Sequence, residues 1–277
     1  MTNQTPTQKA HLLFDVLDDL PLEGYEASFK MMRQSFSKVR FLIGVKTKYL
    51  IKNRFDNICN KLAMPDIFYN QCMEKITDSN TVLFGFEEDV NHCIYKIYLE
   101  FSDKNKAIVQ QTKSKTPLIQ YIGFKWDAFN TQKAFTTIYK WFPFISTKEL
   151  FDRIHQILKK KDYFQFVLMK EFIELAISRS GHSFDPYIYL EANDMNSESD
   201  RKSLDLNFYQ VGLKMLDVEA FIIKMMHFFE IPPQKWDVFL RQIRRKVFGH
   251  MSGGYNSSGQ LFFNVYYDVF SCEEKIV

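Results

Sequence analysis

Polar side chains capable of chemistry recur at every second position in several strand-like segments of this chain. In residues 94–101, Lys96, Tyr98 and Glu100 share one parity, and oily residues occupy the other. The same alternation occurs in residues 25–31 and 203–209. Because side chains alternate across a β-strand, each segment has one polar and one apolar face. Ammonium, phenol and carboxylate groups on a shared face can bind an anion and move a proton.

The segments between these strands have helical spacing, and amphipathic helices need an apolar surface to cover. We predict strands at residues 24–33, 38–46, 81–87, 93–101, 118–129, 134–142, 187–191, 203–211, 250–251 and 261–269. We predict helices at residues 10–20, 49–62, 65–76, 146–160, 164–178, 217–230 and 233–247, and a loop or short helix at 103–115. About ten antiparallel strands are more than an open sheet usually carries. The sequence therefore predicts an α+β fold: a closed antiparallel barrel of hairpin–helix repeats, with helices outside and a polar lumen.

The length and composition of the chain suit one such barrel. A chain of 277 residues can bury a large core, and no compositional break or long linker divides it. We therefore predict a single domain over residues 1–277, with a lead-in over 1–20 and the barrel over 22–270. Aromatic residues make up 16% of the chain, which suits a cavity lined by rings, although core packing accounts for much of the phenylalanine.

Charge, cysteine spacing and hydropathy exclude several classes of protein. A net charge of +3 is too small to predict a nucleic-acid partner. The cysteines lack metal-ligand spacing and follow no secretory signal, and the histidines form no cluster. We therefore predict a cytoplasmic protein without a structural metal. No apolar run reaches the length of a membrane-spanning helix, so we expect no membrane partner, and we expect a monomer.

Short motifs spread through most of the chain support a more specific interpretation. They are Glu-Ala-Ser-Phe-Lys-Met at 26–31, Arg-Phe-Leu at 40–42, Tyr-Lys-Ile-Tyr at 95–98, Tyr-Ile-Gly-Phe at 121–124, Phe-Asn at 129–130, Ile-Tyr at 138–139 and Tyr-Tyr at 266–267. In this order and spacing, the chain resembles the ABBA-barrel aromatic prenyltransferases. Within that fold it is most similar to the cyanobactin prenyltransferases, which modify ribosomal peptides (RiPPs). The first two motifs are the more specific ones.

The resemblance implies a transferase that moves a dimethylallyl or geranyl group from its diphosphate to a peptide side chain or an aromatic, indole-type acceptor. It implies natural-product biosynthesis and a donor that ionises to an allylic carbocation. The sequence has no Asp-Asp-x-x-Asp motif, since Asp18-Asp19 is followed by Leu20-Pro21. We therefore expect Mg²⁺ to be bound through the diphosphate, without a cage of protein carboxylates.

The resemblance assigns the basic and phenolic residues to the leaving diphosphate. A guanidinium can bind phosphate oxygens bidentately, whereas an ammonium acts as a compact charge. The predicted diphosphate-binding residues are Arg40, Lys96, Tyr98, Lys125, Asn264 and Tyr266. A solvated surface charge is the alternative for each lysine and arginine.

Two further roles follow from the same comparison. Glu26 is the predicted catalytic carboxylate, because the attacked atom of the acceptor must lose a proton; a strand-face ion pair with Lys30 is the alternative. Aromatic faces can stabilise a carbocation and exclude water. The predicted cation-shielding and acceptor-pocket residues are Tyr139, Tyr189, Asn207 and Tyr209.

One departure from the resembled family leaves a second function open. The peptide-modifying relatives carry a basic residue where Asn264 stands and a histidine near the position of Tyr98. A degenerate barrel that binds a peptide or an apolar ligand in a biosynthetic complex is therefore the alternative to an enzyme, and a hydrolase using the same lumen is a third option. The glycine-rich residues 253–259 are predicted to form a hairpin turn, and the basic residues at 241–246 a solvated helix face, with an acidic leader peptide as the other possibility.

Overall fold

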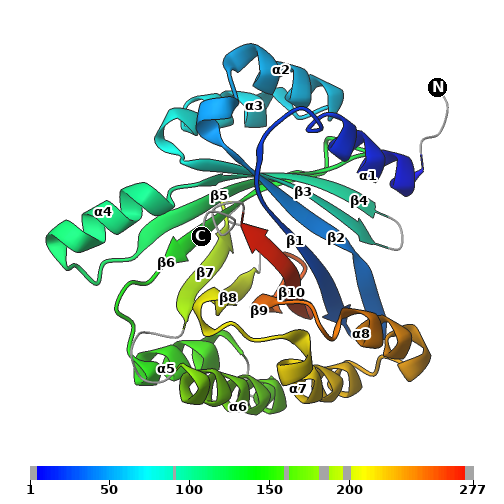
Figure 1. Ribbon diagram of the computed structural model, residues 1–277, viewed down its shortest axis with the longest axis vertical. Coiled ribbons are helices and arrows are strands. Elements are labelled where there is room, and N and C mark those ends of the chain that lie inside the picture. The colour runs from blue at the N-terminus through cyan, green and yellow to red at the C-terminus, as the bar shows by residue number, and fades with distance from the viewer. Residues whose placement is uncertain (1–4, 90–91, 159–161, 181–186, 196–200, 272–277) are drawn as a thin grey trace.

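Ten antiparallel strands close into a barrel in a computed structural model that describes residues 5–89, 92–158, 162–180, 187–195 and 201–271. Consecutive strands are neighbours throughout, and β1 pairs with β10 to complete the circuit (Figure 1). The closed barrel predicted from the alternation of polar and apolar residues is therefore confirmed.

The elements follow one another as strand pairs and helices. The strands are β1 (Leu22–Met32), β2 (Ser35–Lys46), β3 (Thr81–Asp89), β4 (His92–Glu100), β5 (Leu118–Asp127), β6 (Ala134–Trp141), β7 (Ile188–Asp194), β8 (Lys202–Asn207), β9 (Phe248–Tyr255) and β10 (Leu261–Ser271). The α-helices are α1 (Pro6–Asp15), α2 (Lys52–Lys61), α3 (Asp66–Met73), α4 (Ser102–Thr112), α5 (Thr147–Ile157), α6 (Tyr163–Arg179), α7 (Met215–Phe228) and α8 (Asp237–Ile243). Short 3₁₀ turns include η4 (Tyr209–Val211) and η5 (Pro233–Lys235).

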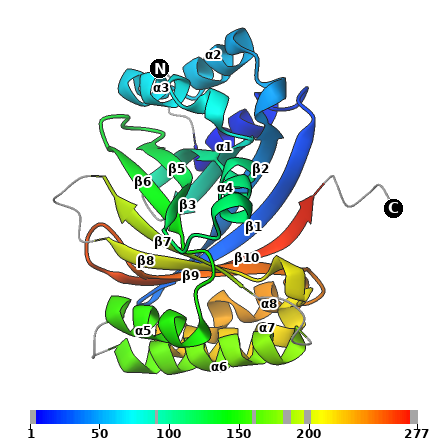
Figure 2. The ribbon, with the colours of Figure 1, turned by 90° about the vertical axis from the view of Figure 1, so that its left-hand side faces the viewer.

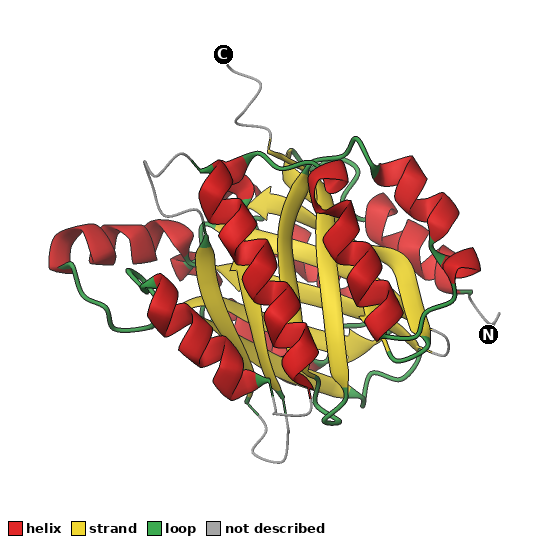
Figure 3. Ribbon diagram, turned by 90° about the horizontal axis from the view of Figure 1, so that it is seen from below, coloured by secondary structure: helices red, strands yellow, loops and turns green. Residues whose placement is uncertain are grey.

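Helices cover the outer surface of the barrel on two flanks (Figure 2). Helices α5 to α8 pack on one flank, where the rings of Phe172, Phe208 and Phe248 meet at centroid distances of 5.0 to 6.1 Å. Helices α1 to α3 cover the other flank, where Trp126 donates a hydrogen bond to the carbonyl of Leu62. Figure 3 shows helices lying across the strands from outside. The apolar faces of the strands thus turn outward, and each aromatic pair adds about 0.5–1.5 kcal/mol beyond area burial.

Most elements lie where the sequence predicts them, and the exceptions have local causes. The capping box before α5 is present, since Ser146 and Glu149 bond each other's backbone N–H groups. The predicted turn at 253–259 begins too early, because β9 continues to Tyr255. Gly254 has φ of 124° and lies so close to β8 that a Cβ would sit 2.3 Å from the carbonyl oxygen of Lys202. The glycines therefore serve close strand pairing here, and not only a turn.

Two predicted elements are too long. The helix predicted at 233–247 is the turn η5 followed by the short α8, and the strand predicted at 203–211 ends at Asn207. The basic residues after α8 form exposed ion pairs with acidic neighbours, among them Arg244 with Glu219 at 2.7 Å and Lys246 with Asp268 at 2.9 Å. None of the described helices has the length and apolar character needed to cross a membrane.

Candidate functional site

The lumen contains two cavities, which lie toward opposite ends of the strands. The larger cavity, of about 570 Å³, is lined by the first residues of β1, β3 and β5 and by the last residues of β2, β4 and β10. We call it the wide chamber. The smaller cavity, of about 280 Å³, is lined by the other ends of these strands and contains most of the lumen's lysine and arginine side chains. We call it the basic chamber.

Strand register brings the predicted cations together in the basic chamber. Lys96 on β4 lies opposite Lys125 on β5, and Arg40 on β2 lies opposite Glu87 on β3. Residues directly opposite in antiparallel strands point to the same face of the sheet. A residue that faces the lumen on one strand therefore lies beside a lumen-facing residue on the next strand. The sequence prediction that basic groups from separate strands face a shared lumen is thus matched for these positions.

Glu87 is the electrostatic centre of the basic chamber. Its carboxylate lies 3.2 Å from the Nζ of Lys30 and 3.2 Å from a guanidinium nitrogen of Arg40, and it also accepts a hydrogen bond from Lys96. Burial would raise the pKa of Glu87, but Arg40, Lys30 and Lys96 together hold it well below its usual range. Burial also lowers the pKa of Lys96 to about 8, against the opposing attraction of Glu87.

Arg40 and Asn264 form a second contact in this chamber. The guanidinium of Arg40 donates to Oδ1 of Asn264 at 2.6 Å, and Nδ2 of Asn264 donates to Oγ of Ser252 at 2.8 Å. The buried Nε–H of Arg40 has no hydrogen-bond partner among the described residues. An unsatisfied buried N–H of a guanidinium is costly in a folded protein.

Lys125 sits among rings instead of carboxylates. Its Nζ donates to Thr137 at 3.0 Å and to the hydroxyl of Tyr139 at 3.1 Å, and lies 5.4 to 5.7 Å from the ring centroids of Tyr98, Phe135 and Tyr139. Burial, with the charges of Arg201 and Lys96, holds the pKa of Lys125 well below its usual range. No ion pair neutralises this amine within the described part of the chain.

Three tyrosines lie where the two chambers meet: Tyr98, Tyr139 and Tyr266, together with Asp205, line both cavities, and we call the three tyrosines the tyrosine belt. The rings of Tyr98 and Tyr139 meet edge to face with centroids 5.8 Å apart. Tyr98 reaches this position because β5 has Gly123 beneath it, where a Cβ would lie 2.6 Å from the ring. The belt presents ring faces and edges at the point where the chambers meet.

A carboxylate–imidazole–carboxylate arrangement occupies the wide chamber. Nδ1 of His250 lies 2.9 Å from Asp205, and its Nε2 lies 3.2 Å from Glu26. Burial alone would lower the pKa of His250, but the charges of Asp205 and Glu26 outweigh it and raise the pKa to about 10. The ring of His250 stacks on Tyr266 at 3.7 Å, and Tyr209 donates to Glu26 at 2.9 Å. The predicted catalytic carboxylate is therefore held by two donors and lies next to the belt.

The remaining predicted site residues divide between the lumen and the outer core. Tyr209 lines the wide chamber from the turn η4, and Asn207 lines it from the end of β8. Tyr189 does not reach the lumen. It is fully buried outside the barrel, where its ring lies 5.5 Å from that of Phe142 and its hydroxyl donates to Glu191. On β7 the lumen positions are Leu190 and its even-numbered neighbours, so Tyr189 has the outward parity.

Sequence reasoning missed Glu87, Asp205 and His250 as members of the site. The alternation along β3 could have indicated Glu87. Phe84 and Phe86 occupy the apolar parity of this strand, so Glu87, like Gly85, has the lumen parity. His250 was assessed only as a metal ligand. Its cross-strand neighbour Tyr266 was a predicted site residue, and this pairing would have indicated its role.

A metal ion would need a group of suitable ligand side chains. No group of three or more histidine, cysteine, aspartate or glutamate side chains is arranged to hold a metal among the residues that the structure places. In the basic chamber both carboxylate oxygens of Glu87 already accept from cations. A divalent cation is therefore not expected to bind the protein directly there.

Comparison with solved structures identifies the architecture. The 5-dimethylallyltryptophan synthase of Streptomyces coelicolor aligns with a TM-score of 0.62 and 9% identity, over 98% of this chain and 93% of its own. The 6-dimethylallyltryptophan synthase of Micromonospora olivasterospora, solved with DMASPP and Trp, aligns with a TM-score of 0.56 and 10% identity, over 88% of this chain and 81% of its own. The prenyltransferase NotF aligns with a TM-score of 0.55 and 11% identity, over 88% of this chain and 80% of its own.

These similarities extend over nearly the whole barrel, and the chain has the ABBA barrel fold of these enzymes. At such low identities the likeness is one of fold. No family model matches the sequence. A search of curated proteins also found no match.

Proposed function

We propose that this protein is a prenyltransferase, which moves a dimethylallyl or geranyl group from its diphosphate to an aromatic or peptide acceptor. The observation that carries the proposal is the division of one sheltered lumen into a basic chamber and a wide chamber by a belt of tyrosines. A diphosphate fits the cations of the first chamber, and an acceptor fits the second. The reacting carbon then lies between them, at the belt.

Ionisation of the donor is the step that the basic chamber would promote. The allylic C–O bond breaks and the diphosphate leaves with the electron pair, so roughly three negative charges must be stabilised. Arg40 and Lys96 face this position with fixed donors, and Lys125 adds an amine that no carboxylate of the described residues pairs with. An arriving diphosphate would share the three cations that surround Glu87.

Capture of the carbocation is assigned to the belt and the wide chamber. The rings of Tyr98, Tyr139 and Tyr266 would stabilise the cation through their faces and keep water from it. The acceptor atom forms the new bond to the allylic carbon and then loses a proton to Glu26. His250 bridges Glu26 to Asp205, which fixes the orientation of the Glu26 carboxylate.

The resemblance of the sequence to the cyanobactin prenyltransferases suggests the acceptor class, the location and the oligomeric state. We propose that the acceptor belongs to peptide-derived or indole-type natural products, as in the cyanobactin branch, and that the protein acts as a cytoplasmic monomer. Mg²⁺ is proposed to accompany the diphosphate.

The direct test is a mass shift. Purified protein is incubated with dimethylallyl or geranyl diphosphate, Mg²⁺ and a panel of tryptophan, tyrosine and arginine peptides. We expect one acceptor to gain a prenyl mass. Arg40→Ala and Lys96→Ala should each lower turnover at least 100-fold, because ionisation loses a charge-assisted contact. The matched controls Arg241→Ala and Lys224→Ala remove exposed ion pairs on the helices and should leave turnover unchanged. Full activity in both lumen variants would refute the proposal.

A non-catalytic binding module remains the second candidate, and Glu87 is the observation that favours it. A carboxylate inside the cation cluster neutralises part of the charge on which a diphosphate would depend. In this case the donor analogue binds but no acceptor gains mass. Release of free prenyl alcohol without transfer would instead identify a hydrolase.

A further inference from the structure

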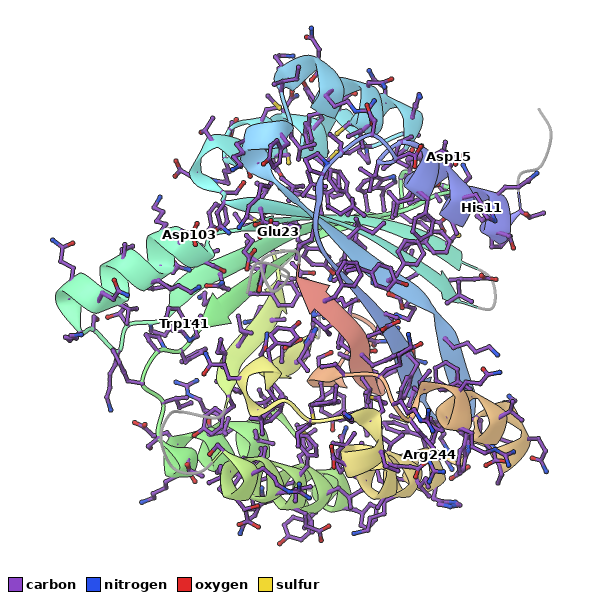
Figure 4. The ribbon with its side chains drawn as sticks, viewed as in Figure 1. His11, Asp15, Glu23, Asp103, Trp141 and Arg244 are labelled. Carbon is purple, nitrogen blue, oxygen red and sulfur yellow. The ribbon has the colours of Figure 1, made fainter. Side chains whose placement is uncertain are left out.

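The lumen is electrically polarised along its axis. The basic chamber is lined by the cations Lys30, Arg40, Lys96, Lys125 and Arg201, against the two carboxylates Glu87 and Asp205. The wide chamber is lined by the carboxylates Glu23, Glu26, Glu100, Asp103 and Asp205, against the two lysines Lys46 and Lys106 and the imidazole of His250. Figure 4 labels Glu23 at the start of β1 and Asp103 at the start of α4, at the end of the barrel where the wide chamber lies. A ligand in the wide chamber therefore meets an excess of negative charge.

Three of these carboxylates have a cationic partner among the described residues, the exposed Asp103 has none, and neither does the half-buried Glu100. Glu23 pairs with Lys46 at 2.7 Å, and Glu26 and Asp205 flank His250. Glu100 accepts only from neutral groups: the hydroxyls of Ser102 and Tyr121 and, at 3.5 Å, the amide of Asn80. Within the described chain, Glu100 is thus a lumen carboxylate without a counter-charge.

Aromatic groups connect Glu100 to the belt. Tyr121 lies opposite Glu100 across the β4–β5 pair and donates to it at 3.2 Å. The ring of Tyr121 meets that of Tyr139 edge to face, with centroids 6.1 Å apart. A ligand whose aromatic ring lies at the belt could therefore extend a short chain along Tyr121 and place its end at Glu100.

We propose that the acceptor is an organic cation, in which a protonated amine lies on a short chain attached to the aromatic ring that is prenylated. This inference rests on the proposed function and names the substrate class of its wide chamber. The ammonium would bind Glu100 and supply the missing counter-charge. An anionic acceptor would place a second negative charge next to an uncompensated carboxylate, which is unfavourable in a partly desolvated site.

Calorimetry with three indole probes tests this substrate class. The protein is first saturated with dimethylallyl S-thiolodiphosphate, and tryptamine, 3-methylindole and indole-3-propionate are then titrated separately. These share a ring and differ in charge. We expect tryptamine to bind at least 10-fold more tightly than 3-methylindole, and indole-3-propionate to bind most weakly. Glu100→Gln should reduce the tryptamine affinity about 10-fold and leave 3-methylindole unchanged. The control Glu174→Gln alters an exposed glutamate on α6 and should change neither.

The outcomes separate this inference from the proposed function. If wild-type protein binds tryptamine and 3-methylindole equally, the inference is wrong, whether or not the Glu100 variant folds. Unchanged tryptamine binding in a folded Glu100→Gln protein also overturns it. The proposed function depends instead on the donor: failure of the thiolodiphosphate to bind in the Arg40-dependent manner refutes that function, whatever the order of the indole affinities.

Discussion

Replacing Glu87 by glutamine tests whether the basic chamber is built to receive an anion. Glu87 neutralises Lys30, Arg40 and Lys96 at contact distance, and it is buried. Removing one partner of a buried charge cluster typically costs about 3–5 kcal/mol. For a chain of this length, that loss lowers the melting temperature by roughly 5–9 °C. The free protein with Glu87→Gln should therefore be clearly less stable.

An added anion should reverse part of this loss. In wild-type protein a diphosphate must share its cations with Glu87 and lie near that carboxylate. Two like charges about 4–5 Å apart repel by roughly 3–4 kcal/mol at an effective dielectric constant of about 20. Even if side-chain movement removes more than half of this repulsion, pyrophosphate should bind Glu87→Gln about 10-fold more tightly. Thermal unfolding with and without pyrophosphate, and calorimetry with the thiolodiphosphate, measure both effects.

The pH dependence gives an independent check. The pKa of Glu87 is held well below its usual range by Arg40, Lys30 and Lys96, although burial opposes them. A carboxylate whose pKa is lowered in the folded state stabilises the protein at pH values above its pKa in the unfolded state, about 4.3. This contribution is lost as the pH falls through the pKa of the folded state. The stability gap between wild type and variant should be constant between about pH 5 and 7 and should close in acid. Equal pyrophosphate affinity and equal melting temperatures in the two proteins would refute the reasoning.

Three further changes have defined outcomes. Because burial lowers the pKa of Lys96 to about 8, kcat/KM for the donor should fall about tenfold per pH unit above pH 8, as the ammonium is lost; Lys96→Arg should move this limb to higher pH, and an unmoved limb assigns it to another group. Glu26→Gln should lower kcat about 10²–10⁴-fold with unchanged donor affinity, because it removes the proton acceptor but no diphosphate contact; unchanged kinetics would remove its role. His250→Asn should lower kcat about 10-fold while KM for the donor stays constant, since the bridge between Glu26 and Asp205 is lost; a parallel rise in the donor KM would mean that the whole lumen had collapsed.

The fold was accessible from sequence because the barrel repeats one rule on every strand. Polar groups such as Ser28 and Lys96 occupy the lumen parity, and apolar groups such as Phe29 and Ile97 occupy the outer parity. Where the alternation of polar and apolar residues along a strand is weak, it does not show which residues face the lumen. On β7 the lumen residues include Leu190, so the polar Tyr189 was placed on the wrong face of the strand.

The site was less accessible, because its pairings cross strands that are distant in the sequence. Glu87 and Arg40 meet through the β2–β3 register, and Glu26 and His250 meet because β1 and β10 close the barrel. Alternation along one strand identifies which residues face the lumen, but not how far along the barrel each one lies. A one-residue change of register exchanges the faces of a strand, and the bulges of β1 and β5 shift the positions further.

The distribution of counter-charges in the lumen suggests what the barrel is arranged to accept. Buried charges are tolerated when they are paired, and most lumen charges here obey that rule. Among the buried and half-buried charges of the described residues, the exceptions lie at opposite ends: Lys125 in the basic chamber and Glu100 in the wide chamber. An anionic donor satisfies the first and a cationic acceptor satisfies the second. Binding of one ligand leaves the other chamber unsatisfied, so the barrel is expected to be most stable when both are present, with the tyrosine belt between them. Melting temperatures that rise more with both ligands than with either alone would agree with this arrangement, and no gain from the second ligand would contradict it.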